Sequence, residues 1–231
     1  MTTILGGTSP LQGTRAVVNM SIFADSITTG SKLPGHAYYE SQELCEDGTS
    51  TNGVQNFTNC TSAIENEVNS LVAMEIPVVT SANNQNDGNC STTPARLGYG
   101  GTHATTYHTI TVGATTLDTS TYADSRLSIT STFGSNYGPC VSMWAPGGPL
   151  TVAFKTTSGN STTIVSSGGS SFASALVSGA VARLLEQYPT LSATGVWAEL
   201  QTRAALRNPQ PADFDPSSTT NQKLLYLSHL E

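Results

Sequence analysis

The stretch SAIENEVNSLVAMEIPVVT, residues 62–80, decides the fold class. Ser62 and Glu65 stand three residues apart, as in a capping box, and predict the start of a helix. The apolar side chains that follow repeat at helical spacing and predict one buried face: Ile64, Val68, Leu71 and Val72. Residues 76–80 are apolar and mostly β-branched, which predicts a buried strand with Pro77 near its first residue.

A second buried strand precedes this helix. Residues 16–22, AVVNMSI, form a short and mostly apolar run, which is typical of a strand covered on both faces. A strand, a helix and a further strand make a βαβ unit, whose strands are parallel and whose crossover is right-handed. The sequence therefore predicts an α/β fold.

More elements follow along the chain. A helix from Ser171 to about Gln187 is apolar or small on nearly every side, which predicts a helix buried in the centre of the domain. Ser192 caps a last amphipathic helix. Residues 24–61 are rich in Gly, Thr, Asn and Ser and predict an inserted surface loop within a single domain, residues 1–231. Further strands, the last two as a hairpin, are expected at residues 109–114, 140–144, 150–154 and 161–166.

The composition is poor in charge. Charged residues make up 11% of the 231 residues, against roughly 25% in an average soluble protein. The formal net charge of -7 offers no basic surface for phosphate groups. No apolar stretch approaches the roughly 20 residues that a membrane span requires. We therefore expect a soluble protein that binds neither nucleic acid nor membranes.

The chain has four cysteines, and none of them shows the paired Cys-x-x-Cys spacing of a zinc site. An even number of cysteines in a chain rich in Ser and Thr fits two disulfides formed in an oxidising compartment. The residues after Met1 do not form a secretory signal. The cysteines nevertheless favour a secreted, extracellular protein, and no metal ion or cofactor is expected.

Residues 168–175, GGSSFASA, bring a serine to the start of the long helix. The two glycines allow a sharp turn, and Ser171 follows at a helix N-terminus, where unpaired N–H groups stabilise a developing oxyanion. This form of a nucleophile elbow makes Ser171 the candidate nucleophile. A capped helix start without a catalytic role is the alternative.

A second candidate stands at the end of the strand predicted at residues 76–80. The chain continues Thr80-Ser81-Ala82-Asn83, and reactive groups in parallel sheets gather at the carboxyl ends of the strands. Asn83 would present an amide donor there. Together with the backbone N–H of Ser171, it would give two donors that converge on one oxygen.

These segments resemble the subtilisin-like serine proteases, and in particular the proteinase K-like branch of that family. Residues 17–22 are similar to the family's strand that binds the substrate backbone, and residues 80–83 to the segment that ends in the oxyanion asparagine. Residues 169–175 are similar to the motif of the nucleophilic serine. Three further blocks resemble proteinase K-like enzymes in the same order: residues 89–96, 111–115 and 135–141.

The resemblance implies a three-layer α/β fold in which helices flank a mainly parallel central sheet, here without its N-terminal portion. It implies a serine-type endopeptidase that acts on polypeptides as a monomer without a cofactor. Ser171 would be the nucleophile and Asn83 part of the oxyanion hole. The residues that it places along the substrate are Ser21, Ile22, Phe23, Thr80, Ser81 and Ala82.

The resemblance extends to the cysteines and to a calcium site. Two matching cysteines of the family form a disulfide, which implies a bond between Cys90 and Cys140 and leaves Cys45 to pair with Cys60. Ser142 stands where the family often has an aspartate that binds calcium. Because a hydroxyl is a far weaker ligand for this hard cation, we expect the calcium site to be lost.

The chain departs from the family in the groups that activate the serine. Family members carry an Asp-Thr/Ser-Gly and a His-Gly-Thr-His motif before the substrate-binding strand, and residues 101–103 are only a fragment of the second. Surface or capping roles are expected for His36, His103, His108 and His229. We therefore expect the C-terminal part of a catalytic domain, inactive alone because a serine hydroxyl needs a histidine base.

Two other functions fit parts of the sequence. A non-catalytic, protease-like module would bind extended peptides by strand addition along residues 18–22. A lipase-like α/β-hydrolase is disfavoured, because Ala173 stands where the Gly-x-Ser-x-Gly turn has its last glycine.

Overall fold

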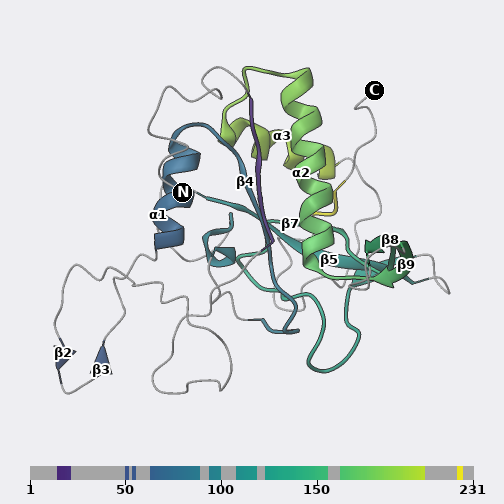
Figure 1. Ribbon diagram of the computed structural model, residues 1–231. Helices are drawn as coiled ribbons and strands as arrows, with labels where there is room; N and C mark the ends of the chain where they lie inside the picture. The colour runs from purple at the N-terminus through teal and green to yellow at the C-terminus, as the bar shows by residue number, and fades with distance from the viewer. Residues whose placement is uncertain are drawn as a thin grey trace.

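The computed structural model places most of the predicted elements, and Figure 1 shows their arrangement. The residues that it describes are 15–21, 50–51, 54–55, 63–88, 94–99, 108–118, 123–155, 162–205 and 223–225. Within these ranges no helix is both long and apolar enough to cross a membrane.

A mainly parallel sheet forms the centre of the described structure. Its parallel strands are β1 (Val18–Met20), β4 (Val78–Ser81), β5 (Ile110–Asp118) and β7 (Met143–Pro146). β4 lies between β1 and β5, and β7 also pairs with β5. A further strand, β6 (Ala123–Arg126), runs antiparallel to β5. This sheet confirms the predicted α/β fold.

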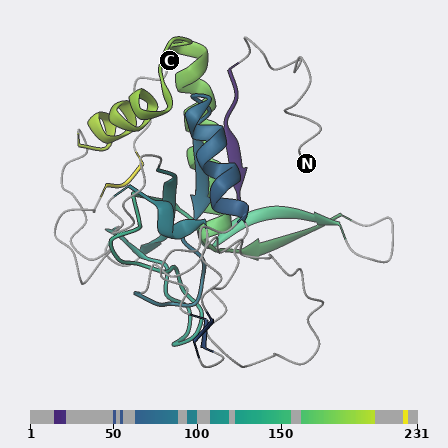
Figure 2. The ribbon, with the colours of Figure 1, turned by 90° about the vertical axis from the view of Figure 1, so that its left-hand side faces the viewer.

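Helices cover both faces of the sheet, as Figures 1 and 2 show. α1 (Ala63–Ala73) connects β1 to β4 and completes the predicted βαβ unit. Successive residues of a strand point to opposite faces, so Val78 packs in the cluster of α1 whereas Val79 packs in the cluster of the other two helices. Those two are α2 (Ser170–Gln187) and α3 (Ala193–Ala205). The three predicted layers are therefore present.

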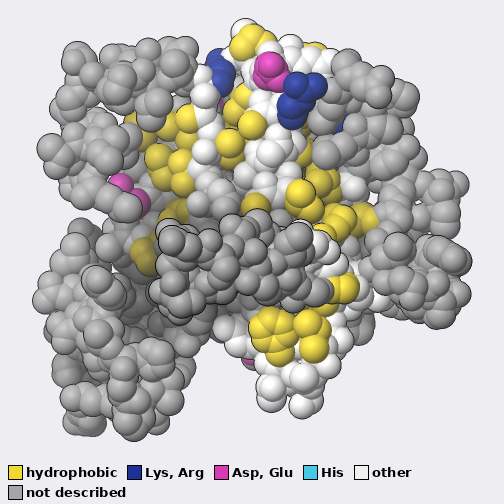
Figure 3. All heavy atoms as spheres, turned by 45° about the vertical axis from the view of Figure 1, so that its right-hand side comes forward, with side chains coloured by type: hydrophobic (Ala, Val, Ile, Leu, Met, Phe, Trp, Pro, Cys, Tyr) yellow, Lys and Arg dark blue, Asp and Glu magenta, His cyan; other side chains and the backbone are white. Residues whose placement is uncertain are grey.

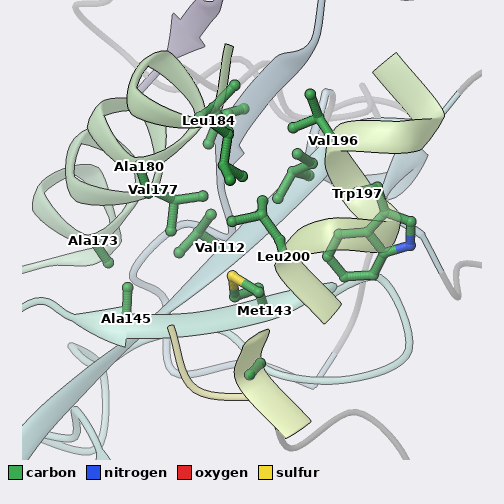
Figure 4. Packing of buried hydrophobic residues seen from close by; sticks show 14 of the residues in the cluster. Val112, Met143, Ala145, Ala173, Val177, Ala180, Leu184, Val196, Trp197 and Leu200 are labelled. Atoms are coloured by element: carbon green, nitrogen blue, oxygen red, sulfur yellow. The ribbon is translucent and has the colours of Figure 1, made fainter. Parts of the chain in front are cut away.

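The larger core lies between the sheet and the helices α2 and α3. Figure 4 shows Val177 and Leu184 of α2 facing Val112 of β5, with Leu200 of α3 beside them. The side chain of Leu200 is 1% exposed. α3 begins at its predicted cap, because the hydroxyl of Ser192 accepts the N–H of Gly195 at 2.9 Å.

The prediction that the helix at 171–187 is buried in the centre of the domain is wrong for one of its faces. One face of α2 is buried, but four of its apolar or small residues are exposed: Ala175, Leu176, Gly179 and Ala182. Leu176 is 44% exposed, and a Cβ built on Gly179 would meet no atom within 4 Å. Figure 3 shows hydrophobic side chains and few charged ones on the described surface of this side. The sheet covers only one face of the helix.

The predicted hairpin is confirmed. It consists of β8 (Leu150–Lys155) and β9 (Thr162–Ser167), which pair antiparallel along their whole length. β9 ends one residue before Gly168, so the hairpin delivers the chain to the turn that opens α2.

Several elements differ from the prediction. The strand expected at residues 140–144 begins only at Met143, because the N–H of Val141 bonds to Gly138 in a preceding turn. β6 and the short 3-10 helix η2 (Ala95–Leu97) lack a clear hydrophobic period and were not predicted. Inside the loop expected at residues 24–61 lies one antiparallel pair, β2 (Ser50–Thr51) and β3 (Val54–Gln55). The rest of this loop lies outside the described residues.

Candidate active site

The turn before α2 can be made only by glycines. A Cβ on Gly168 would lie 2.8 Å from the carbonyl oxygen of Gly147, which is too close for a side chain. Gly169 has a φ of 151°, a conformation that residues with side chains rarely adopt. The N–H of Gly169 donates to the oxygen of Gly147 at 2.6 Å. The turn is therefore fixed against the end of β7.

Ser171 is the second residue of α2 and is partly buried. Its carbonyl oxygen accepts hydrogen bonds from the hydroxyls of Ser174 at 3.0 Å and Ser21 at 3.4 Å. Neither its N–H nor its hydroxyl has a partner within the described part of the chain. Both groups of Ser171 therefore keep their hydrogen-bonding capacity for a ligand.

Asn83 lies two residues beyond β4 and is 3% exposed. Its φ of 74° is left-handed, a conformation that asparagine tolerates better than most residues. Its carbonyl accepts the N–H of Asn136 at 2.9 Å, and its side-chain Oδ1 accepts the hydroxyl of Ser81 at 3.4 Å. These bonds fix both the backbone and the amide of Asn83.

The side chain of Asn84, three residues after the end of β4, is hydrogen-bonded to the first residue of α2. Its Oδ1 accepts two hydrogen bonds from Ser170, one from the N–H at 2.8 Å and one from the hydroxyl at 3.1 Å. Asn83 and Ser171 are the next residues on either side of this bonded pair, so the structure brings the two predicted site residues to one end of the sheet. Asn84 is not among the residues predicted from the sequence, where its only signal is its place after Asn83.

The other residues that were predicted to line a substrate do not all lie at the site. Ser21 lies at the site, where its hydroxyl also shares a hydrogen bond of 3.1 Å with Ser174. Thr80, Ser81 and Ala82 are at most 2% exposed, so their side chains belong to the interior. Ile22 and Phe23 lie outside the described residues.

His108 is the one histidine among the described residues, and it lies elsewhere. Its ring centroid is 4.9 Å from that of Tyr99, which in turn stacks on Trp197 of α3 at 4.7 Å. The other three histidines fall in ranges that the structure does not describe. The described part of the chain thus places no histidine beside Ser171.

The predicted cysteine and calcium positions are only partly described. Cys140 is 2% exposed, but the other three cysteines lie outside the described residues, so both disulfide pairings stay predictions. The hydroxyl of Ser142 accepts the N–H of Thr111 at 3.2 Å inside the sheet. No group of three or more His, Cys, Asp or Glu side chains gathers within the described ranges in a way that could hold a metal ion.

Comparison with curated proteins finds two relatives. The chain is 37% identical over 139 residues to an extracellular serine proteinase of Thermus sp. (strain Rt41A), a match that covers 60% of this chain and 28% of that protein. It is 35% identical over 133 residues to the proprotein convertase subtilisin/kexin type 9 of Mus musculus, covering 58% of this chain and 16% of that protein. The chain thus spans less than a third of the length of either relative.

Solved structures show the same fold. A cold adapted subtilisin-like serine proteinase matches with a TM-score of 0.50 and 27% identity, over 70% of this chain and 49% of that chain. The A-subunit of the AB5 toxin from E. coli matches with a TM-score of 0.54 and 19% identity, over 69% and 51%, which concerns the fold alone. The model of the subtilase family matches residues 5–224. The chain therefore belongs to the subtilase family of serine proteases.

Proposed function

We propose that this chain carries part of the active site of a serine-type endopeptidase. Ser171 would be the nucleophile, and its backbone N–H together with the amide of Asn83 would form the oxyanion hole. The observation that supports this assignment is the pair of hydrogen bonds from Ser170 to Asn84, which holds Asn83 and Ser171 at one end of the sheet. Membership of the subtilase family supports the same chemistry.

The proposed reaction begins at the hydroxyl of Ser171. Its Oγ attacks the carbonyl carbon of a peptide bond, and the carbonyl oxygen becomes an oxyanion. The N–H of Ser171 and the Nδ2 of Asn83 donate to that oxygen and stabilise the charge as it develops. Ser81 donates to the Oδ1 of Asn83, which leaves Nδ2 as the donor end of the amide.

The reaction also requires a base that removes the proton of the serine. His108, the one histidine within the described residues, packs against Tyr99, and the sequence lacks the His-Gly-Thr-His motif that supplies the base in the family. We therefore propose that the 231-residue chain alone hydrolyses peptides at a negligible rate. In subtilisin, a member of the same family, loss of the histidine or of the serine costs about a millionfold in rate.

Peptide hydrolysis by the purified chain tests this proposal. We expect no turnover above that of Ser171→Ala, with Ser174→Ala as a control one turn further along α2. Turnover that Ser171→Ala abolishes and Ser174→Ala keeps would support the nucleophile but refute the inactivity of the chain. Turnover that survives Ser171→Ala would refute the role of Ser171.

We also propose that the substrate is an extended polypeptide met outside the cell and that the chain is a monomer. The Thermus relative is an extracellular proteinase, and the cysteines favour an oxidising compartment. Mass spectrometry of unreduced peptides should find Cys90 joined to Cys140 and Cys45 joined to Cys60. Other pairings would refute the assignment, and four free thiols would refute the secreted location.

A second candidate is a peptide-binding module without catalysis. Within the described residues β1 pairs only with β4, and a peptide in this function would add as a strand along the other edge of β1. In this case peptides would bind with equal affinity to the chain and to Ser171→Ala, and no covalent adduct with Ser171 would form. Isothermal titration at alkaline pH, where hydroxide takes the place of the base, with an unmodified peptide and with a peptide boronic acid separates the two candidates.

A further inference from the structure

We infer that Asn84 is a positioning residue for the reaction at Ser171. It acts through Ser170, whose N–H and hydroxyl it binds, and so sets the first turn of α2 against the oxyanion asparagine. The inference rests on the proposed function of Ser171 and Asn83, and it adds a residue that contacts neither the oxyanion nor the substrate.

The start of α2 shows why such a residue is needed. The first four N–H groups of a helix have no acceptor inside the helix, and a side chain at the N-cap usually takes one of them. The N-cap here is Gly169, which has no side chain and makes no capping bond. Asn84 replaces that cap from 86 positions away in the sequence.

Three of the first four N–H groups of α2 have an acceptor within the described residues, and that of Ser171 does not. The N–H of Ser170 goes to Asn84 at 2.8 Å. Those of Phe172 and Ala173 both go to the carbonyl oxygen of Gly169, at 3.1 and 3.4 Å. Within the described residues the N–H of Ser171 alone has no acceptor, so it is the one left to bind an oxyanion.

Asn84 also lies against the glycine of the turn. A Cβ on Gly169 would be 3.2 Å from both the Oδ1 and the Nδ2 of Asn84. Ser170, which donates the two bonds, is fully buried. The amide of Asn84 thus lies between the glycine turn and Ser170, where its acceptor and its shape both matter.

The segment that carries Asn84 is itself held in place. The carbonyl of Asn84 accepts the N–H of Gly134 at 3.2 Å. The side chain of Asn136 accepts the N–H groups of Gln85 at 2.8 Å and Asp87 at 3.2 Å, and its backbone N–H binds Asn83. The hydrogen bonds of Asn84 therefore hold the first turn of α2 at a defined position relative to this fixed segment.

The test compares a tetrahedral mimic of the transition state with its ground-state counterpart. The probes are a tetrapeptide boronic acid, Ala-Ala-Pro-boroLeu, and the matching peptide amide, both titrated into the full 231-residue chain at alkaline pH. Hydroxide then takes the proton of Ser171 in place of a histidine base and leaves as water, while the Oγ of Ser171 adds to boron and makes it tetrahedral and anionic. Boron NMR reports the tetrahedral adduct with Ser171. A residue that aligns the oxyanion donors affects the boronate much more than the amide.

Two variants separate the roles. Asn84→Ala removes the acceptor, and Asn66→Ala is a control at an exposed asparagine of α1. We expect Asn84→Ala to bind the boronate about tenfold more weakly while its amide affinity stays within about twofold. Asn66→Ala should stay within about twofold for both probes.

The outcomes distinguish this inference from the proposed function. A chain that forms no adduct, or an adduct that survives Ser171→Ala, refutes both. An adduct lost in Ser171→Ala but unchanged in Asn84→Ala refutes only the positioning role. Parallel losses for boronate and amide in Asn84→Ala, or an equal loss of boronate affinity in Asn66→Ala, also refute it.

A further variant covers the case in which Asn84→Ala does not fold. Ser170→Ala keeps the N–H bond to Asn84 and loses only the hydroxyl bond of 3.1 Å. We expect its boronate affinity to fall by about threefold while its amide affinity is unchanged, because one of the two hydrogen bonds between Ser170 and Asn84 remains. An unchanged boronate affinity in this variant would refute the inference.

Discussion

Burial of the Tyr99 side chain changes the pKa of its phenol. Its ring lies between those of His108 and Trp197. Burial raises the pKa of its phenol above the usual 10.0; the nearby Glu75 acts in the same direction, and a hydrogen bond with Thr194 opposes it. The neutral phenol is thus the form that the folded protein favours.

The raised pKa of Tyr99 predicts a loss of stability at alkaline pH. Because the folded state holds this proton more tightly than the unfolded state, its contribution is complete below pH 10 and is lost as the pH rises through the folded pKa. Urea unfolding at pH 8 and at about pH 11 should show a smaller decline for Tyr99→Phe than for the wild type. Tyr188→Phe, at a 40% exposed position, should decline as the wild type does.

A single methyl group added at Gly169 should strain the turn before Ser171. In Gly169→Ala the φ of 151° becomes strained, and the new Cβ meets Asn84 at 3.2 Å. We expect a loss of about 1–3 kcal/mol in the free energy of unfolding. Urea denaturation measures it, and a change below about 0.5 kcal/mol would contradict the strained turn.

At the scale of the elements, α2 has two different faces. Ala173, Val177 and Leu184 are fully buried in the main core, whereas Leu176 is 44% exposed. The composition of the helix did not distinguish these faces, since small and apolar residues lie on both. The distinction arises only because the sheet and α3 cover one side.

The exposed face of α2 predicts a stabilising substitution. Gly179 lies inside the helix, and a Cβ there meets no atom within 4 Å. Gly179→Ala should therefore raise the free energy of unfolding by about 0.5–1 kcal/mol through helix propensity. Ala180→Gly, at the neighbouring position that is 2% exposed, should lower it. Chemical denaturation of both variants tests the assignment of the faces.

At the scale of the whole molecule, one core unites the sheet with α2 and α3. Residues from β4, β5, β7 and both helices meet in it, as Figure 4 shows for a part of the cluster. Loss of a side chain from this core should destabilise the fold as a whole, because the layers share the same contacts.

Two leucines, one inside this core and one outside it, test whether the core stabilises the fold. Leu200→Ala removes a side chain that is 1% exposed and should cost about 2–5 kcal/mol in unfolding free energy. Leu176→Ala, at 44% exposure, should change it by less than about 1 kcal/mol. Similar effects of the two substitutions, measured by urea denaturation, would contradict the burial of Leu200 in the core or the exposure of Leu176.

The sequence by itself determined what depends on local pattern. The βαβ unit, the hairpin before Gly168 and the helix that begins at Ser171 follow from hydrophobic period, capping residues and glycine turns, and the structure has them within a few residues. Ser171 and Asn83 could be named for the same reason, since the ends of strands and the starts of helices are visible in a sequence.

Only the tertiary structure decided what depends on residues far apart in the chain. The bonds between Asn84 and Ser170 span 86 positions, and no local signal marks an amide as their acceptor. The antiparallel pairing of β6 is likewise set by its fit along β5, since Ala123–Arg126 carries no strand pattern. The exposed face of α2 depends on which elements surround the helix, because burial is a property of the packed molecule.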